Sequence, residues 1–261
     1  MLLTIDVGNT NIVFSFYEGD VLAGSFRLRT DPKATADEIG IQATQYLNHF
    51  GLPTSGFEGA VIGSVVPQVV SALESAVSKY FGCQPVVVDR DVFPPLKSYA
   101  QEPLGTDRST ALIAARAKYG APLIMLDFGT ATTVDALDEN GDYLGGVINT
   151  GLRTSMNALG AGAALLSSVE LEMPDRVLGR NTVEQVQGGV VGSYIGGVEY
   201  LVRRTKAEMG LDPAIVKVVA TGGLSHLIAA HTDVIDAIEP ELVPEGLRLC
   251  FYLYQAEQKR N

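Results

Sequence analysis

Two short apolar runs in the chain lead into the same acidic turn. Residues 2–5 and 123–126 are compact and largely apolar, which is typical of buried strands. The first run ends at Asp6 and the second at Asp127, and each Asp begins an Asp-x-Gly sequence. More β-branched residues, a hairpin turn with Gly and a third apolar segment follow in both places. The pattern predicts that one three-stranded unit occurs twice, with a single residue inserted in one copy.

Apolar residues at helical spacing follow each of these units, and further short strands separate them. The predicted helices span residues 36–50, 67–81, 107–119, 182–209 and 244–259, and the additional strands span 60–66, 86–88 and 216–220. Alternating strands and helices predict an α/β fold with mixed sheets flanked by helices. A boundary near Gly120 predicts two halves, residues 1–119 and 120–261, packed face to face around a cleft.

Charge and composition exclude several classes of protein. The net charge of −11 and the pI near 4.7 weigh against a general nucleic-acid binder, which needs a basic surface. Cys83 and Cys250 are too few for a disulfide framework or a thiolate metal site. The N-terminus lacks the basic segment of a signal peptide, and the uncharged stretches are shorter than a membrane span. We therefore expect a cytoplasmic protein with no nucleic-acid or membrane partner.

The repeated turn has a chemical interpretation as well as a structural one. Backbone N–H groups in a glycine turn form a concave site that suits phosphate. A carboxylate beside that site would repel phosphate unless a divalent cation such as Mg²⁺ lies between them. Two such turns facing across a cleft would hold a polyphosphate from both sides. The alternative for a single copy is an ordinary hairpin turn.

Five ordered motifs resemble those of the type III pantothenate kinases. They are DVGNTNIV at residues 6–13, GTDR at 105–108, DFGTATT at 127–133, GRNT at 179–182 and ATGG at 220–223. That family belongs to the superfamily of actin, hexokinase and Hsp70. The resemblance implies two duplicated ribonuclease H-like (actin-like ATPase) domains. It also implies ATP-dependent phosphorylation of the terminal hydroxyl of pantothenate, which is the first step of coenzyme A biosynthesis.

The resemblance implies a role for the residues of each motif in the nucleotide site. Asp6 would help to hold Mg²⁺ or Mn²⁺ through water, and Asp127 would bind a monovalent cation, K⁺ or NH₄⁺. Thr130 would contact an ATP phosphate, while Gly222 and Gly223 would form the turn beside adenosine. The first phosphate loop would consist of Asp6, Val7, Gly8, Asn9, Thr10, Asn11, Ile12 and Val13.

Pantothenate would bind to a second group of residues, with Asp107 as the general base that accepts the hydroxyl proton. Phosphoryl transfer to an alcohol depends on such an acceptor and on in-line positioning. The alternative is that Asp107 only caps the helix that follows it. Arg108 suits the pantothenate carboxylate, or it orients Asp107. The implied pocket contains Tyr99, Gly105, Thr106, Asp107, Arg108 and Thr182.

Tyr99 departs from the family pattern, which places a Tyr nine residues before the catalytic Asp. Position 98 is Ser, and Tyr99 lies eight residues before Asp107. The segment between them is therefore one residue shorter than in the family. The alternative for Tyr99 is a half-buried aromatic residue of a loop.

The predicted helix of residues 182–209 contains five glycines, at positions 188, 189, 192, 196 and 197. Each destabilises an isolated helix by up to about 1 kcal/mol relative to Ala, so close packing must offset the cost. The family resemblance implies a homodimer packed through this helix, and the alternative is packing within the chain. Two other functions remain open: a kinase of the same superfamily acting on another small alcohol, and a non-catalytic nucleotide-binding regulator.

Overall fold

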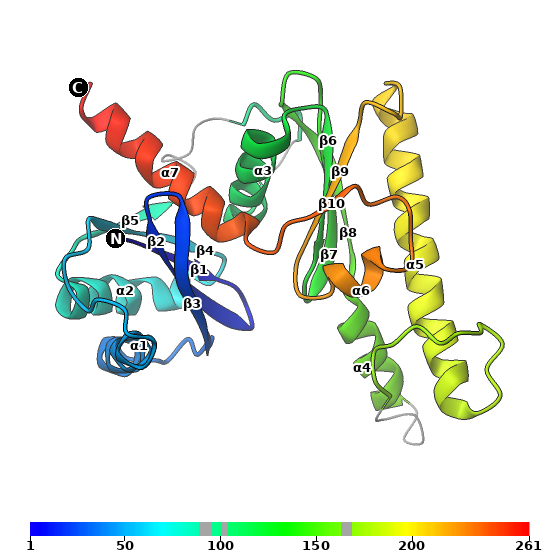
Figure 1. Ribbon diagram of the computed structural model, residues 1–261, viewed down its shortest axis with the longest axis horizontal. Helices are drawn as coiled ribbons and strands as arrows, with labels where there is room; N and C mark the ends of the chain where they lie inside the picture. Colours follow the sequence, from blue (N-terminus) through cyan, green and yellow to red (C-terminus); the bar gives the residue numbers. More distant parts are fainter. Residues whose placement is uncertain (89–95, 101–103, 163–168, 261) are drawn as a thin grey trace. The chain divides into compact units, whose positions relative to one another are not determined.

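The computed structural model describes residues 1–88, 96–100, 104–162 and 169–260, and their strands form two five-stranded mixed sheets (Figure 1). Across the first sheet the order is β3 (Val21–Arg29), β2 (Asn11–Glu18), β1 (Leu2–Val7), β4 (Gly59–Ser64) and β5 (Pro85–Val88). Across the second it is β8 (Tyr143–Thr150), β7 (Ala131–Leu137), β6 (Leu123–Phe128), β9 (Lys217–Thr221) and β10 (Ala237–Ile238). Both sheets thus share one strand order, which confirms the predicted duplication.

Seven α-helices and one π-helical turn are assigned in the described residues. They are α1 (Ala36–Phe50), α2 (Pro67–Ala76) with its continuation η1 (Val77–Phe81), α3 (Thr106–Tyr119), α4 (Leu152–Gly162), α5 (Thr182–Met209), α6 (Ser225–Ala229) and α7 (Leu242–Gln258). α1 and α5 have the predicted bounds because both ends of each are capped. Thr35 and Asn181 accept hydrogen bonds from N–H groups of the first turns, and Gly51 and Gly210 end the helices in the left-handed conformation.

The chain forms two compact units. Unit 1 consists of residues 1–96, 102–114 and 242–261, and unit 2 of residues 97–101 and 115–241. α7 therefore belongs to the unit that contains the first sheet, although it comes last in the chain. The division into halves at residues 119 and 120 stays a prediction about the repeat. In the compact units, the last helix of the chain groups with the first sheet instead.

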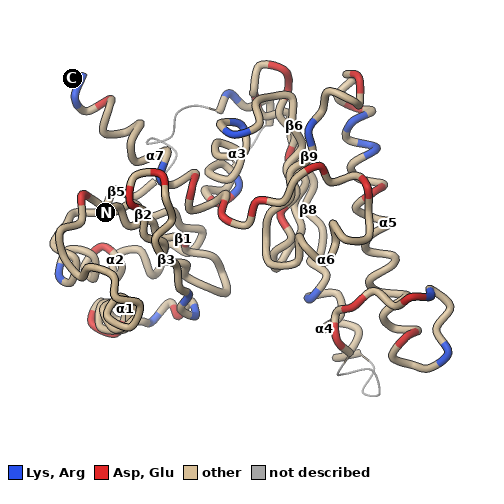
Figure 2. The backbone as a smooth tube through the Cα atoms, viewed as in Figure 1, with Lys and Arg blue, Asp and Glu red and all other residues tan. Residues whose placement is uncertain are grey.

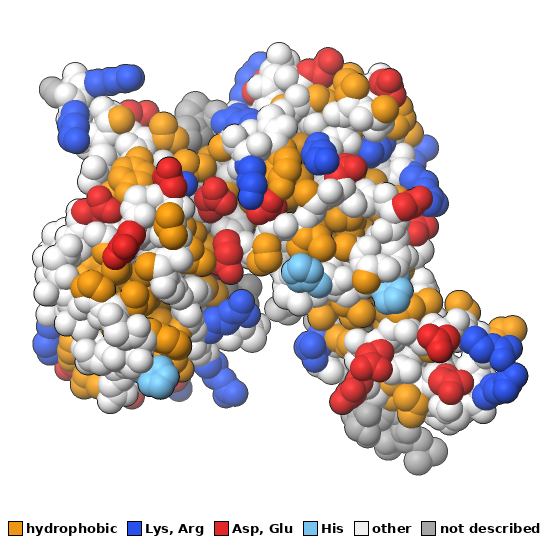
Figure 3. Space-filling model, in the orientation of Figure 1, with side chains coloured by type: hydrophobic (Ala, Val, Ile, Leu, Met, Phe, Trp, Pro, Cys, Tyr) orange, Lys and Arg blue, Asp and Glu red, His pale blue; other side chains and the backbone are white. Residues whose placement is uncertain are grey.

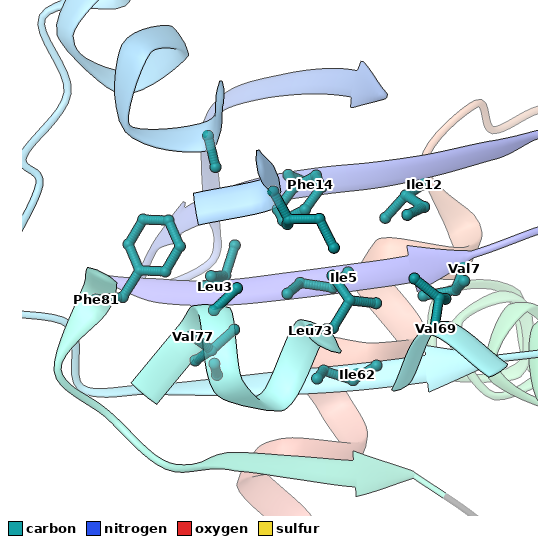
Figure 4. Close-up of a cluster of buried hydrophobic side chains, with 14 of the residues drawn as sticks. Leu3, Ile5, Val7, Ile12, Phe14, Ile62, Val69, Leu73, Val77 and Phe81 are labelled. Carbon is teal, nitrogen blue, oxygen red and sulfur yellow. The ribbon is translucent and has the colours of Figure 1, made fainter. Parts of the chain in front are cut away.

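Unit 1 has a core on each face of its sheet. Figure 4 shows Leu3, Ile5 and Val7 of β1 pointing toward α2. On the opposite face, residues of β1, β2, β4 and β5 pack against α3 and α7; this cluster is Leu2, Tyr17, Val61, Val88, Ile113, Leu247, Cys250 and Phe251. Burial there raises the pKa of the Cys250 thiol to about 12, so this cysteine is an inert core residue. Because side chains alternate along a strand, Asp6 lies on the α3 and α7 face.

Unit 2 buries the corresponding residues of its central strand against α5. Ile124, Leu126 and Phe128 pack with Val191, Ile195 and other apolar residues of that helix. Asp127 therefore lies on the other face of the second sheet. Acidic side chains are spread over both units in Figure 3. No helix in the described part of the chain is long and apolar enough to span a membrane.

Candidate active site

The two acidic turns have the same local environment but different lengths. β1 and β6 are buried throughout except at Asp6 and Asp127, which are half-buried. In each turn the glycine N–H donates across the turn to a carbonyl oxygen, from Gly8 to Asn11 and from Gly129 to Ala131, with N···O 3.0 Å in both. However, Asp6 pairs with Val13, whereas Asp127 pairs with Thr133. The first turn is therefore one residue longer, a difference that the matching sequences do not reveal.

Residues that follow the third strand of each unit form hydrogen bonds with the acidic turn. The Thr30 N–H donates to the Thr10 carbonyl at 3.0 Å, and its hydroxyl donates to the Gly8 carbonyl at 2.6 Å. In unit 2 the Gly151 N–H donates to the Thr130 carbonyl at 3.1 Å, and the Thr154 hydroxyl donates to the same oxygen at 2.8 Å. A side chain at Gly151 would collide with the carbonyl groups of this turn. Both turns are thus held by hydrogen bonds from the segment that follows the third strand.

Within unit 1 the start of α3 lies next to Asp6. Gly63 of β4 pairs with Asp6 in the parallel register. A Cβ atom placed on Gly63 would lie 3.1 Å from Thr106 Cγ2 and 2.7 Å from Leu247 Cδ2, so α3 and α7 both cover this point of the sheet. Asp107, half-buried, is the next residue of α3. Unit 1 therefore brings the first acidic turn and the GTDR segment to one face of its sheet.

Asp107 occupies the first turn of α3 and lies one position inside the helix. Because α3 begins at Thr106, Asp107 is the second residue of the helix rather than the residue before it. Asp107 Oδ1 accepts a hydrogen bond from the Arg108 N–H at 2.8 Å. The hydroxyl groups of Ser109 and Thr110 bind the carbonyl oxygens of this turn, each at 2.8 Å. A carboxylate at a helix N-terminus is also stabilised by the helix dipole.

The Gly63→Ala variant is expected to move the start of α3. The added methyl group meets Leu247 and Thr106, so the free energy of unfolding should fall by about 1–3 kcal/mol and kcat should fall severalfold. Urea unfolding and steady-state kinetics measure both effects. Gly162→Ala is the control, since a Cβ there meets nothing within 4 Å. Equal behaviour of the two variants would contradict the positioning role of Gly63.

In unit 2 the ATGG turn touches the second acidic turn. Thr221 of β9 pairs with Asp127 of β6, and Gly222 follows with a φ of +88°. A Cβ on Gly222 would lie 2.5 Å from Asp127 Oδ1 and 2.7 Å from the Phe128 backbone. A Cβ on Gly223 would meet nothing within 4 Å. Gly222 is thus required by the protein's own backbone, whereas Gly223 borders open space.

A buried hydroxyl group without a partner lies beside Asp127. Thr133 pairs with Asp127 across β6 and β7, and its Oγ1 is buried and has no hydrogen-bond partner among the described residues. The neighbouring Thr132 forms a hydrogen bond with the Tyr194 hydroxyl group from α5. Burial raises the pKa of Tyr194, and the negative charge of Asp127 acts in the same direction, while the hydrogen bond with Thr132 opposes them. Within the described residues no group of three His, Cys, Asp or Glu side chains forms a metal cluster.

A cavity of about 580 Å³ lies beside the ATGG turn in unit 2. Its apolar lining includes Met156, Leu171, Leu224 and Leu227, and Arg153, Asn157 and Glu170 contribute polar or charged groups. This volume and mixed lining are typical of a site for a small organic ligand. The cavity therefore offers space for a small heterocycle next to Leu224, the residue that follows the ATGG turn.

Tyr99 and Thr182 lie in unit 2, apart from the GTDR segment in the division of the chain. The Tyr99 N–H donates to the Tyr143 carbonyl at 2.9 Å, its side chain is 56% exposed, and Lys97 lies over its ring. Thr182 is the exposed first residue of α5. The segment before it caps that helix, with the Arg180 N–H donating to Glu184 at 2.7 Å. Their roles toward a substrate stay predictions.

Comparisons with known proteins agree with one another. The family model described as type III pantothenate kinase matches residues 2–204. A type III pantothenate kinase of Paramagnetospirillum magneticum is 45% identical over 250 residues, covering 95% of each chain. Another, from Geobacillus kaustophilus, is 42% identical over 253 residues, covering 96% of this chain and 97% of the relative.

Solved structures with much lower sequence identity share the fold. A protein from Campylobacter jejuni, assigned to the Baf family of transcriptional activators, has a TM-score of 0.61 at 18% identity and covers 97% of this chain and 99% of its own. The activator of 2-hydroxyisocaproyl-CoA dehydratase from Clostridium difficile, with bound ADPNP, has a TM-score of 0.53 at 13% identity and covers 100% and 97%. At these identities the likeness concerns the fold alone, which is that of the actin-like ATPases.

Proposed function

Because the chain belongs to the type III pantothenate kinase family, we propose that its two acidic turns hold ATP while Asp107 activates pantothenate. The members of this family are ATP-dependent kinases that catalyse the first step of coenzyme A biosynthesis. The family and the kinase activity predicted from the motifs are confirmed by the comparisons. The observation that supports the site is the approach of α3 to Asp6 within unit 1. It places a carboxylate for proton acceptance beside a turn suited to phosphate.

In the proposed reaction, Asp107 accepts the proton of the terminal hydroxyl group while that oxygen attacks the γ-phosphorus. The products are 4′-phosphopantothenate and ADP. Arg108 follows Asp107 in α3 and is proposed to bind the pantothenate carboxylate, because a guanidinium group matches that anion. Gly105, Thr106, Tyr99 and Thr182 are proposed to complete the pantothenate pocket.

The first turn fits Mg²⁺ or Mn²⁺. Asp6 supplies one carboxylate beside a phosphate-binding turn, and Mg²⁺ is commonly bound through one or two carboxylates, water and substrate phosphates. The ion would neutralise phosphate charge during transfer. The residues of the turn, from Asp6 to Val13, would position the phosphate groups around it.

The second turn fits a monovalent cation, K⁺ or NH₄⁺. The Asp127 carboxylate and the unpartnered Thr133 hydroxyl lie opposite each other on neighbouring strands, and both are oxygen ligands. Thr130 in the same turn is proposed to contact an ATP phosphate. Adenosine is proposed to lie against Gly222 and Gly223, because a Cβ on Gly223 meets no described atom within 4 Å, and its base is proposed to enter the cavity that Leu224 lines.

The test is ADP release from Mg-ATP in the presence of K⁺, with and without pantothenate. We expect release that depends on pantothenate, and lower rates when Mg²⁺ is omitted or Na⁺ replaces K⁺. Nucleotide binding without pantothenate-dependent turnover would instead favour a kinase of another small alcohol or a regulator. The 42–45% identity to pantothenate kinases weighs against both alternatives. The cytoplasmic location predicted from the sequence stays a prediction.

We also propose that the protein is a homodimer packed through α5. A contact within the same chain explains the glycine at position 188, since a Cβ there would lie 2.7 Å from the Val177 carbonyl oxygen. No such contact explains Gly189, Gly196 or Gly197, because a Cβ at each meets no atom of the described residues within 4 Å. Exposed positions at helical spacing connect them, ending at Tyr200, which is 65% exposed. Close approach of a second helix would offset the destabilising effect of these glycines.

The Ser193→Arg variant is expected to be monomeric. Ser193 lies between Gly189 and Gly196 on the exposed stripe of α5, and an Arg there would prevent close approach. Light scattering after size exclusion should give twice the chain mass of 27.7 kDa for the unmodified protein and the single mass for the variant. Gln45→Arg on the exposed face of α1 is the control and should remain dimeric. A dimeric Ser193→Arg variant would place the interface elsewhere.

A further inference from the structure

Two arginine residues lie on the same sheet face as Asp6. Asp6 of β1 pairs with Val13 of β2, and Val13 pairs with Arg27 of β3. Residues directly opposite each other in antiparallel strands project to the same face. Arg27, Val13 and Asp6 therefore form one row across the first sheet, and Gly63 beneath α3 continues that row.

The end of β3 is fastened to the first acidic turn. Arg29 pairs with Asn11, the last residue of that turn, and lies on the same face as Arg27 because the two are separated by one residue. The next residue, Thr30, donates two hydrogen bonds to carbonyl oxygens of the turn. Basic positions gather at this end of β3 in Figure 2. Both arginine side chains are thus carried by a strand whose end cannot move independently of the turn.

The two side chains are available to a ligand. Arg27 and Arg29 are exposed, and neither forms an ion pair or side-chain hydrogen bond with the part of the chain that the structure describes. The guanidinium group of Arg248 on α7 differs, since it is buried and bound to Asp20 at 2.5 Å. Arg108 also has an interaction within the protein. An exposed arginine is usually only solvated, but Arg27 and Arg29 lie on the same face of the first sheet as Asp6.

The negative charges on this face would repel a nucleotide triphosphate unless a cationic group lies near its phosphates. Asp6 and Asp107 are both acidic, the chain carries a net charge of −11, and a nucleotide triphosphate would add further negative charge. Phosphoryl-transfer sites ordinarily supply a Lys or Arg to the phosphate groups in addition to the metal ion. The chain has no Gly-Lys pair of the kind that supplies this Lys in a P-loop.

We propose that Arg27, with Arg29 beside it, binds the terminal phosphate groups of the nucleotide at the first acidic turn, an inference that rests on the proposed nucleotide site. An arginine fork forms paired charge-assisted hydrogen bonds with phosphate oxygens. Arg27 holds phosphate oxygens from the β3 end of the row, and the start of α3 covers the opposite end at Gly63. Arg29 adds positive charge at the mouth of the turn.

The test compares ATP and AMP binding by calorimetry in the Arg27→Gln variant, without pantothenate. ATP should bind about 10- to 100-fold more weakly, as expected for loss of hydrogen bonds to a charged group, whereas AMP affinity should stay within about twofold. Arg27→Lys should recover part of the ATP affinity because the charge remains. Arg204→Gln is the control for the loss of one exposed arginine on α5 and should not change ATP binding.

Unchanged ATP affinity in Arg27→Gln would overturn the proposal, as would an equal loss for AMP. An equal loss in Arg204→Gln would indicate a general effect of net charge and would also overturn it. ATP binding and ADP release by the unmodified protein distinguish failure of this inference from failure of the proposed function. If it binds ATP but shows no pantothenate-dependent ADP release, the proposed substrate fails and the Arg27 comparison still applies. If it binds no ATP, both proposals fail.

Discussion

The Asp107→Asn variant is expected to lose about 10²- to 10⁴-fold in kcat while it still folds and binds ATP. Asparagine has nearly the same shape and can accept the Arg108 N–H hydrogen bond that Asp107 Oδ1 accepts. It cannot take up the proton of the attacking hydroxyl group. The loss should therefore appear in turnover, with little change in the affinity for ATP or in the unfolding transition.

A second acidic first-turn residue provides the matched control for Asp107. Asp37 lies in the first turn of α1, is also in unit 1, and has a largely exposed side chain that pairs with Lys79 at 2.6 Å and accepts a hydrogen bond from Tyr80 at 2.8 Å. If Asp107 acts only through the helix dipole, Asp107→Asn and Asp37→Asn should both leave turnover intact. Single-turnover ADP formation measures the chemical step directly. A loss confined to Asp107→Asn identifies the base, and near-normal turnover would remove Asp107 from the mechanism.

The Gly222→Ala variant should disrupt the second acidic turn and the nucleotide site together. The residue has a φ of +88°, which costs an L-residue about 1–2 kcal/mol. Its methyl group would also lie 2.5 Å from Asp127 Oδ1 and would displace either the carboxylate or the Phe128 backbone. Overpacking of this kind costs about 1–3 kcal/mol more. We expect a clear fall in the urea midpoint, loss of activation by K⁺ and weak ATP binding.

The neighbouring Gly223→Ala variant separates the two roles of the turn. The added methyl group meets no atom of the described residues within 4 Å, so stability should stay within about 0.5 kcal/mol of the unmodified protein. If adenosine lies against this turn, the KM for ATP should rise while the urea midpoint remains unchanged. Similar urea midpoints for the Gly222→Ala and Gly223→Ala variants would show that the backbone strain at Gly222 is unimportant.

Local sequence signals were sufficient to predict the strands and helices whose ends are set by residues close to them in the chain. The Asp-x-Gly repeat predicted the duplicated three-stranded unit, and both sheets have the same strand order. α5 has the predicted bounds because Asn181 and Gly210 cap its ends by contacts within a few residues. The motif resemblance identified the family because its five motifs occur in order along most of the chain.

Features that depend on strand register or on distant backbone contacts could not be predicted in this way. The two acidic turns have matching sequences, yet their strands pair with a difference of one residue. Gly63 carries no motif, and its importance appears only because Thr106 and Leu247 pack over it. Arg27 resembles any exposed strand residue until the register places it in the row with Asp6. A propensity or a motif contains none of this information.

The grouping of α7 with unit 1 has a consequence for the order in which the protein can fold during synthesis. Leu247, Cys250 and Phe251 of α7 complete the core on one face of the first sheet, and a side chain at Gly246 would collide with the Thr110 backbone of α3. The strands of that sheet leave the ribosome early, whereas α7 follows on the order of ten seconds later at usual translation rates. Until then an apolar face of the N-terminal sheet stays uncovered. Folding of unit 1 therefore depends on residues 242–258, and a truncation that removes α7 exposes the apolar residues that this helix covers on the first sheet.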